Sequence, residues 1–240
     1  MGQRRKEAFD FKQFRVKHDR CTMKVGTDAV LLGAWVSVKG VSRALDVGTG
    51  SGVIALILAQ RTNGFAHIDG IEVRDADAQQ ARENVAASPW PDCITIHHGR
   101  VQDFAASQAY DLVVCNPPFF SNGPLPPSTA RQQVRHTQTL TATDLLTAAG
   151  RLLLPTGRLA VVLPTLEAEL WGRQALSTGW YLLRRLAFFS RPDKPQERWL
   201  MEWSRAGAPT QTETLCLYEG EGSAWSGPYR ALTKSLYLAG

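Results

Sequence analysis

Residues 111–119 read D-L-V-V-C-N-P-P-F, an apolar run that is followed by asparagine and two prolines. The apolar run Leu112–Cys115 is typical of a strand buried inside a parallel sheet. Pro117 and Pro118 end this strand, because proline cannot donate a hydrogen bond to a neighbouring strand. Asn116 is therefore expected at the carboxyl end of a strand, which is where open α/β sheets bind ligands.

The N-P-P-F residues have the chemistry of a clamp for an amino group. The Asn116 side-chain oxygen and a carbonyl held rigid by Pro117 are two acceptors, and a planar amino group carries two N–H donors. Phe119 offers a flat face on which a base can stack. A tight turn after a core strand has the same composition, so both interpretations of N-P-P-F alone remain open.

A glycine-rich loop, D-V-G-T-G-S-G over Asp46 to Gly52, lies between a predicted strand and a predicted helix. Gly48, Gly50 and Gly52 allow the backbone to approach a ligand and to turn sharply into the helix. The G-x-G-x-G spacing differs from the dinucleotide-binding pattern G-x-G-x-x-G.

Acidic residues follow the next two predicted strands. Glu72 ends the second strand, about 20 residues after the glycine loop, where such folds bind ribose hydroxyls. A carboxylate accepts from both the 2′- and the 3′-hydroxyl and disfavours a ribose that carries a 2′-phosphate. Asp103 follows the third strand and either accepts from an adenine amino group or caps a short turn, and the sequence leaves both roles open.

The positive charge is concentrated at the N-terminus. The formal net charge of the 240 residues is +5, and residues 1–45 hold 10 Lys or Arg against 4 Asp or Glu. This pattern favours a polyanionic partner. Aromatic residues between the charges favour nucleic acid over a solubilising tail. The candidate phosphate contacts are all basic: Lys12, Arg15, Lys17, Arg20, Lys24, Arg131, Arg135, Arg191 and Lys194; for each one the alternative is a solvated side chain.

The N-terminal region is expected to form its own unit, with residues 1–42 as a basic extension and capping helix before the main domain, residues 43–240. Phe9, Phe11 and Phe14 are expected to dock the extension on that domain. Thr27 or Asp28 is expected to cap the helix, although either side chain can instead point at a ligand.

The C-terminal region contains two predicted strands, Tyr181–Phe189 and Arg198–Trp203, whose connector is too short for a helical crossover, so they must pair antiparallel. Glu213–Tyr218 is a further strand-like run. The long polar loop Ser121–Thr141 is typical of a functional lid.

Several function classes are disfavoured by composition. No apolar run approaches the ~20 residues of a membrane span. The charged N-terminus is not followed by the apolar segment of a secretory signal. The 4 cysteines are far apart and show no metal-ligand spacing. We therefore expect no membrane segment, no metal site and a reducing cytoplasmic setting.

Together these motifs resemble the class I S-adenosylmethionine-dependent methyltransferases. The resemblance implies an α/β, Rossmann-like fold with a seven-stranded, mostly parallel sheet, an antiparallel C-terminal hairpin and helices on both faces. N-P-P-F is similar to the motif of enzymes that methylate adenine N6, guanine N2 or glutamine amide nitrogen. The segments F-R-V-K-H-D-R-C-T-M-K-V-G-T-D-A-V-L-L-G-A-W, Phe14–Trp35, and Y-R-A-L-T-K-S-L-Y-L, Tyr229–Leu238, resemble the bacterial valine-tRNA adenine-N6 methyltransferase family.

This resemblance assigns roles to the candidate residues. It implies that Gly48, Gly50 and Gly52 line the methionine part of S-adenosylmethionine, that Glu72 holds its ribose and that Asp103 meets its adenine. Asp46 is expected to order the loop or to reach the cofactor amine. Lys24, Thr27 and Asp28 are expected to close the site. The catalytic group implied is Asn116, Pro117, Pro118 and Phe119, with Phe119 at a position where many relatives carry Tyr.

The implied reaction is methylation of the adenosine 3′ of the anticodon in valine tRNA, by a protein expected to be a monomer. One alternative is a protein-glutamine N5 or DNA adenine-N6 methyltransferase that uses the same clamp. Another is a cofactor-binding RNA chaperone without catalysis, which would have no use for an amino clamp.

Overall fold

The computed structural model describes residues 7–117 and 140–238. Its helices and strands occur in the following order: β1 (Ala8–Asp10), β2 (Arg15–Lys17), α1 (Thr27–Trp35), β3 (Arg43–Val47), α2 (Val53–Arg61), β4 (His67–Glu72), α3 (Asp75–Ala86), β5 (Ile94–His98), β6 (Tyr110–Cys115), α5 (Ala142–Leu152), β7 (Leu153–Pro164), α6 (Thr165–Ser177), β8 (Tyr181–Phe189), β9 (Arg198–Ser204), β10 (Gln211–Cys216) and α7 (Gly227–Thr233).

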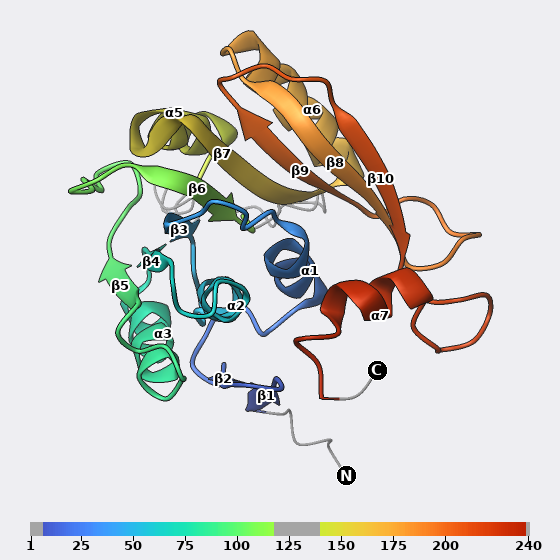
Figure 1. Ribbon diagram of the computed structural model, residues 1–240, viewed down its shortest axis with the longest axis horizontal. Coiled ribbons are helices and arrows are strands. Elements are labelled where there is room, and N and C mark those ends of the chain that lie inside the picture. Colours follow the sequence, from blue (N-terminus) through green and yellow to red (C-terminus); the bar gives the residue numbers. More distant parts are fainter. Residues whose placement is uncertain (1–6, 118–139, 239–240) are drawn as a thin grey trace, which may run out of the picture.

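The centre of the molecule is an eight-stranded sheet in the order β10-β8-β9-β7-β6-β3-β4-β5 (Figure 1). Strands β5, β4, β3, β6 and β7 run parallel, and β9 is antiparallel to both β7 and β8. The order reverses beside β3, with β4 on one side and β6 on the other, and such a switch point is where open α/β sheets bind ligands.

Helices cover both faces of this sheet, and side chains of β6 alternate between them. Leu112 and Val114 belong to an apolar cluster with α1, α2 and α3, whereas Val113 and Cys115 belong to a second cluster with α5 and α6. This alternation is the two-residue period of a strand that is buried on both sides. It explains why β6 reads as a continuous apolar run, as the sequence predicted.

The class I α/β fold and the antiparallel β8–β9 pair are confirmed, but the main sheet has eight strands rather than seven. The additional strand, β10, is parallel to β8. It contains most of the strand-like run expected near Glu213. The β8–β9 hairpin leaves one edge of β8 without a partner, and β10 satisfies the backbone groups along that edge.

The N-terminal segment is folded onto the body of the protein. Strands β1 and β2 form a small antiparallel sheet, and Phe11 and Phe14 are buried in the cluster that contains α1 and α2. The Lys12 backbone N–H donates to the Leu236 carbonyl at 2.8 Å, beyond α7. The phenylalanines therefore dock the segment, as expected from the sequence, and bring the two ends of the chain together.

The prediction that Thr27 or Asp28 caps α1 is wrong. Gly26 is the N-cap residue, with no side-chain capping bond, and Thr27 and Asp28 lie in the first turn. Glycine is an acceptable N-cap because the extended backbone there allows water to reach the free N–H groups. The Asp28 carboxylate is thus left for another partner.

The described ranges contain neither a membrane-spanning helix nor a cluster of metal ligands. No helix there has the length and hydropathy needed to cross a membrane. Residues 7–117 and 140–238 also contain no group of three or more His, Cys, Asp or Glu side chains that is suited to hold a metal ion.

Candidate functional site

The motifs found in the sequence meet at one edge of the sheet. In the strand register, Val47 at the end of β3 pairs with Ile71 of β4 and with Cys115 of β6. The glycine loop, Glu72 and Asn116 follow these three strand ends directly. Because neighbouring strands lie about 4.8 Å apart, Glu72 and Asn116 flank the glycine loop on its two sides.

The glycine loop is held against β4 and faces open space. The backbone N–H groups of Gly48 and Thr49 donate to the Ile71 carbonyl at 2.9 and 3.1 Å. Gly48 has φ +70°, and a Cβ built on it would meet no heavy atom of the described residues within 4 Å. Backbone conformation, rather than crowding, therefore requires glycine there, and the open side leaves room for a ligand.

Asp46 is fully buried beneath this loop. Its Oδ2 accepts from the Thr49 hydroxyl at 2.6 Å and from the Ala55 N–H at 3.2 Å. Burial raises the pKa of this carboxyl to about 7. Its Oδ1 is buried and has no hydrogen-bond partner among the described residues. One oxygen thus orders the loop, and the other can accept from a group that enters the site.

Glu72 joins the glycine loop to the start of α3. Its Oε2 accepts from the Gly50 N–H and its Oε1 from the Arg74 N–H, both at 3.0 Å. Burial raises the pKa of the Glu72 carboxyl, and the Asp77 carboxylate raises it further. A carboxylate has about four lone-pair positions, so Glu72 retains capacity for two ribose hydroxyls.

Asn116 presents an unused acceptor on the other side of the loop. Its side-chain Oδ1 is buried and has no hydrogen-bond partner in the described part of the chain. A buried acceptor without a donor costs about 1–3 kcal/mol, so this site favours a ligand that brings an N–H group. Of the other predicted residues, Pro117 follows directly, whereas Pro118 and Phe119 lie outside the described residues, as do Arg131 and Arg135.

The first turn of α1 reaches this edge through an ion pair that the sequence did not reveal. The Arg198 Nε donates to the Asp28 Oδ2 at 2.9 Å. Arg198 begins β9 and pairs with Pro164 at the end of β7, so the ion pair lies on the ligand-binding side. Thr27 and Lys24 are exposed nearby in sequence. An arginine at the start of a strand carries no sequence signal that separates it from solvated arginines.

Asp103 lies in the turn after β5, and its side chain is exposed. Its backbone N–H donates to the Arg100 carbonyl at 3.1 Å. The role of its carboxylate toward adenine therefore stays a prediction.

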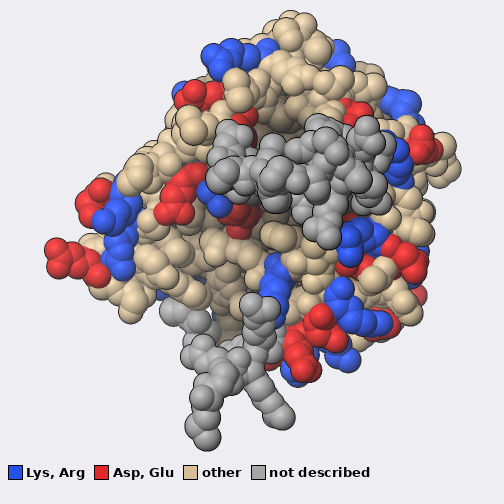
Figure 2. Space-filling model, turned by 180° about the vertical axis from the view of Figure 1, so that it is seen from behind, with Lys and Arg blue, Asp and Glu red and all other residues tan. Residues whose placement is uncertain are grey.

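Most of the described candidates for RNA contacts already bind protein groups. Figure 2 shows Lys and Arg interspersed with Asp and Glu on the face that it presents. The contacts are Lys12 Nζ to the Lys234 carbonyl at 2.7 Å, Arg15 to Asp10 at 3.4 Å, Arg20 to Glu83, Arg191 to the Gly220 and Gly222 carbonyls at 2.7 Å, and Lys194 to Asp193 at 3.6 Å. The Lys17 side chain is exposed, and its backbone binds α3.

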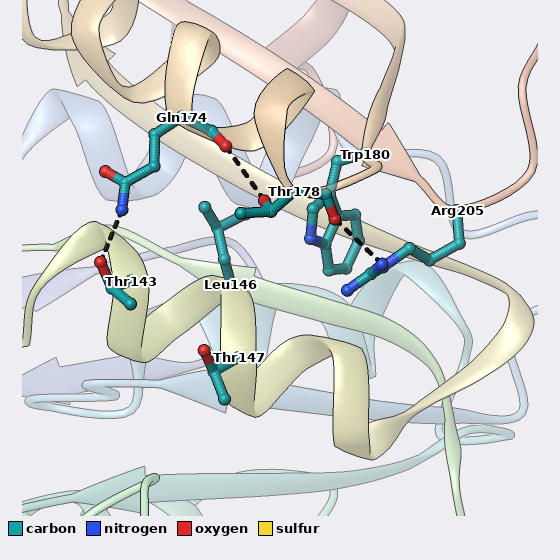
Figure 3. A pocket seen from close by; sticks show the side chains of 7 residues that line it. All are labelled: Thr143, Leu146, Thr147, Gln174, Thr178, Trp180 and Arg205. Atoms are coloured by element: carbon teal, nitrogen blue, oxygen red, sulfur yellow. Dashed lines mark hydrogen bonds between the residues drawn. The ribbon is translucent and has the colours of Figure 1, made fainter.

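A small cavity between α5 and α6 is separate from this edge (Figure 3). It has a volume of about 60 Å³ and is lined by Thr143, Leu146, Thr147, Gln174, Thr178, Trp180 and Arg205. One water needs roughly 10–15 Å³ of cavity volume, so the cavity has room for a few waters. None of its lining residues belongs to the glycine loop, β4 or β6.

Comparisons with known proteins agree with this geometry. A family model described as "Methyltransferase small domain" matches residues 22–170. The tRNA1(Val) (adenine(37)-N6)-methyltransferase of Tolumonas auensis is 44% identical over 96% of this chain and 97% of its own length. The protein of the same description from Pectobacterium carotovorum subsp. carotovorum is 42% identical over 98% and 95%, respectively.

Solved structures show the same fold at low sequence identity. A predicted O-methyltransferase, protein Atu636 from Agrobacterium tumefaciens, has a TM-score of 0.67 and 18% identity and covers 87% of this chain and 96% of its own. The glycopeptide N-methyltransferase MtfA, complexed with (S)-adenosyl-L-methionine, has a TM-score of 0.53 and 13% identity and covers 75% and 99%. Together with the site geometry and the near-full-length relatives, these matches confirm the resemblance drawn from the sequence. The chain belongs to the methyltransferase small domain family and, within it, to the group of tRNA1(Val) (adenine(37)-N6)-methyltransferases.

Proposed function

We propose that this protein transfers a methyl group from S-adenosylmethionine to N6 of the adenosine at position 37, immediately 3′ of the anticodon, in valine tRNA. The observation that carries the proposal is the buried Asn116 Oδ1 beside the glycine loop, which has no hydrogen-bond partner among residues 7–117 and 140–238. The substrate is inferred from the names of the relatives, which are 42–44% identical over nearly the whole chain.

The residues at the sheet edge fit the cofactor. The open side of Gly48 gives space for the methionine part, and Glu72 offers acceptors for the ribose. The free Oδ1 of Asp46 is suited to a positively charged amino group. When bound, the cofactor supplies an electrophilic methyl group on a positively charged sulfur.

Asn116 and Pro117 prepare the nucleophile. The N6 lone pair of adenine is delocalised into the ring, so the free amino group is a weak nucleophile. Hydrogen bonds from N6 to the Asn116 Oδ1 and to the Pro117 carbonyl shift electron density onto nitrogen and aim its lone pair. Asn116 does not act as a base, and the extra proton of the methylated nitrogen leaves afterwards to solvent. Position and fixed dipoles account for most of the rate enhancement.

Phe119 supports the target base in this proposal. An anticodon-loop adenosine must leave its stack to reach the sheet edge, and the Phe119 ring provides a face on which it can stack. A phenylalanine cannot supply the phenol hydrogen bond available to relatives that carry tyrosine there.

We further propose that the protein acts as a monomer in the cytoplasm, where tRNA is modified. The exposed leucines of α6, Leu166, Leu170 and Leu176, are the surface at which a second copy would most readily bind. Sedimentation at micromolar concentration tests the monomer directly.

The deciding experiment is transfer of labelled methyl from S-adenosylmethionine into total tRNA from a strain that lacks this modification, followed by nucleoside analysis. N6-methyladenosine in valine tRNA alone is the expected result. Label in a release-factor peptide or in duplex DNA, and none in tRNA, would instead support the glutamine or DNA alternative. Tight binding of cofactor and tRNA without any transfer would support the RNA chaperone.

A further inference from the structure

Helix α3 buries a polar stripe where an amphipathic helix normally buries apolar residues. Asp77, Gln80 and Asn84 are 4%, 0% and 2% exposed. Their spacing of three and four residues places them on one face. Buried polar groups need hydrogen-bond partners, so the partners of this stripe indicate what the face is for.

Asn84 binds both the N-terminal segment and the glycine loop. Its Oδ1 accepts from the Lys17 N–H at 2.9 Å, and its Nδ2 donates to the Lys17 carbonyl at 2.8 Å. The same Nδ2 donates to the Ser51 carbonyl at 2.8 Å. One side chain therefore fixes the distance between residue 17 and the loop that faces the cofactor.

The rest of the stripe continues this attachment toward the site. Gln80 hydrogen-bonds Arg20, whose guanidinium also pairs with Glu83. The Asp77 carboxylate accepts from the Thr22 N–H at 3.3 Å. Residues 17–22 therefore lie along α3 and follow it toward its N-terminal end, which is the end next to Glu72.

Cys21 shows that this segment comes close to Glu72, the residue expected to hold the cofactor ribose. Burial, together with the nearby carboxylates of Asp77 and Glu72, raises the pKa of the Cys21 thiol to about 12. The effect of a carboxylate falls off with distance, and the Thr22 N–H bond to Asp77 independently places this segment at the same end of α3. Beyond Cys21, the Val25 N–H donates to the His18 Nδ1 at 3.4 Å, which folds the segment back at the start of α1.

We infer that Asp77, Gln80 and Asn84 hold residues 17–22 as a wall of the cofactor site, and that Asn84 couples the position of this wall to the glycine loop. Asn84 and Arg20 are then positioning residues, since neither touches the reacting atoms. The inference rests on the proposed function in that the ligand is an S-adenosyl compound. Binding of the adenosyl ligand and ordering of residues 17–22 must then favour each other.

The experiment measures ligand affinity and wall order in the full chain. The probe is S-adenosylhomocysteine. Affinity comes from titration calorimetry, and order comes from hydrogen exchange of the Lys17 and Thr22 amides, two of the backbone donors to α3. In the unmodified protein the probe should slow exchange at both amides. Asn84→Ala should weaken probe binding about tenfold and abolish that protection.

Two further variants separate the wall from general stability. Arg20→Ala removes an exposed attachment of residues 17–22 to α3 that does not touch the glycine loop. If Asn84 acts only by holding the glycine loop, Arg20→Ala should leave probe binding unchanged. We expect Arg20→Ala to weaken probe binding about threefold and to speed exchange at Thr22 with little change in Tm. Gln79→Ala, at an exposed position of the same helix, is the matched control and should behave like the unmodified protein.

Each outcome decides between the two proposals. If the unmodified protein does not bind S-adenosylhomocysteine, the proposed function fails. If it binds while Arg20→Ala and a folded Asn84→Ala bind equally well and keep the protection, the wall is overturned. If Asn84→Ala does not fold, Arg20→Ala alone decides, and unchanged affinity and exchange in it overturn the inference.

Discussion

The Gly50 backbone N–H donates to the Glu72 Oε2 at 3.0 Å. The acid expected to bind the cofactor ribose therefore also holds the loop expected to bind the methionine part. A change at Glu72 should affect both halves of the cofactor site together.

Glu72→Gln should weaken S-adenosylhomocysteine binding by about 10- to 100-fold. The carboxylate is charged and offers two acceptor oxygens, whereas the amide is neutral and offers one. Titration calorimetry measures the change. Glu169→Gln, at an exposed position on α6, is the control. An unaltered Kd in Glu72→Gln would remove Glu72 from the cofactor site.

Asn116→Ala should reduce methyl transfer to tRNA by about 10²- to 10³-fold, the range found when one preorganised polar contact to a reacting group is removed. Cofactor affinity should change little, because Asn116 lies across the glycine loop from Glu72. Single-turnover transfer with bound labelled cofactor separates the two quantities. Turnover near that of the unmodified protein would contradict the amino clamp.

Asp46 should make stability depend on pH. Its pKa of about 7 in the folded chain exceeds the value of about 3.9 for an unfolded aspartate. Between these values the unfolded chain releases a proton that the folded chain keeps, so the free energy of unfolding falls as pH rises. The slope from this group is at most about 1.4 kcal/mol per pH unit.

Asp46→Asn removes this titration and retains an oxygen that can accept from Thr49. Between about pH 5 and about pH 7, the variant should lose less stability than the unmodified protein. Urea unfolding at several pH values measures the difference between the two proteins. Parallel stability curves over this window would show that Asp46 titrates normally.

Gly70→Ala should disturb the glycine loop from outside it. A Cβ at Gly70 would lie 2.7 Å from the Ile96 Cδ1 and 3.0 Å from the Thr49 Oγ1, so it would push Thr49 away from Asp46. We expect a loss of about 1–3 kcal/mol in the free energy of unfolding and weaker cofactor binding. Gly222→Ala, where the nearest atom is 3.9 Å away, should do neither. Full affinity in a stable Gly70→Ala would show that the loop adapts.

Lys17 and Arg191 should differ in their effect on tRNA binding. The Lys17 side chain is exposed, whereas two carbonyls hold Arg191. Lys17→Ala should lower the slope of log affinity against log salt by about 1, and Arg191→Ala should leave it unchanged. Filter binding at several salt concentrations gives both slopes. If Arg191→Ala lowers the slope and Lys17→Ala does not, the tRNA binds at the β8–β9 connector instead.

Sequence patterns predicted the parts of the site that depend on one strand and its following loop. Asn116, Glu72 and the glycine loop each lie at the carboxyl end of a predicted strand, and parallel strands bring these ends to one edge. The Asp28–Arg198 ion pair could not be predicted in this way, because residues 170 positions apart meet only through the arrangement of α1 and β9. The domain boundary at residue 42 and the adenine contact of Asp103 remain predictions.

Local patterns also failed where tertiary contacts decide the structure. Gly26, and not Thr27 or Asp28, caps α1, because the N-terminal segment fixes the approach to the helix. The Asp77–Asn84 face of α3 reads as an ordinary polar side, since its partners lie in a segment about 60 residues earlier in the chain. Parallel pairing of β10 with β8 likewise depends on which edge remains free after the hairpin forms.

The bond from the Lys12 N–H to the Leu236 carbonyl has a consequence for the order of assembly during synthesis. A contact between residues so far apart in sequence cannot form until Leu236 has left the ribosome. The β1–β2 hairpin must therefore wait for the segment around Leu236 before this bond fixes it in place. Residues 17–22 follow that hairpin directly. The cofactor site should therefore reach its final structure late, after the central sheet has folded.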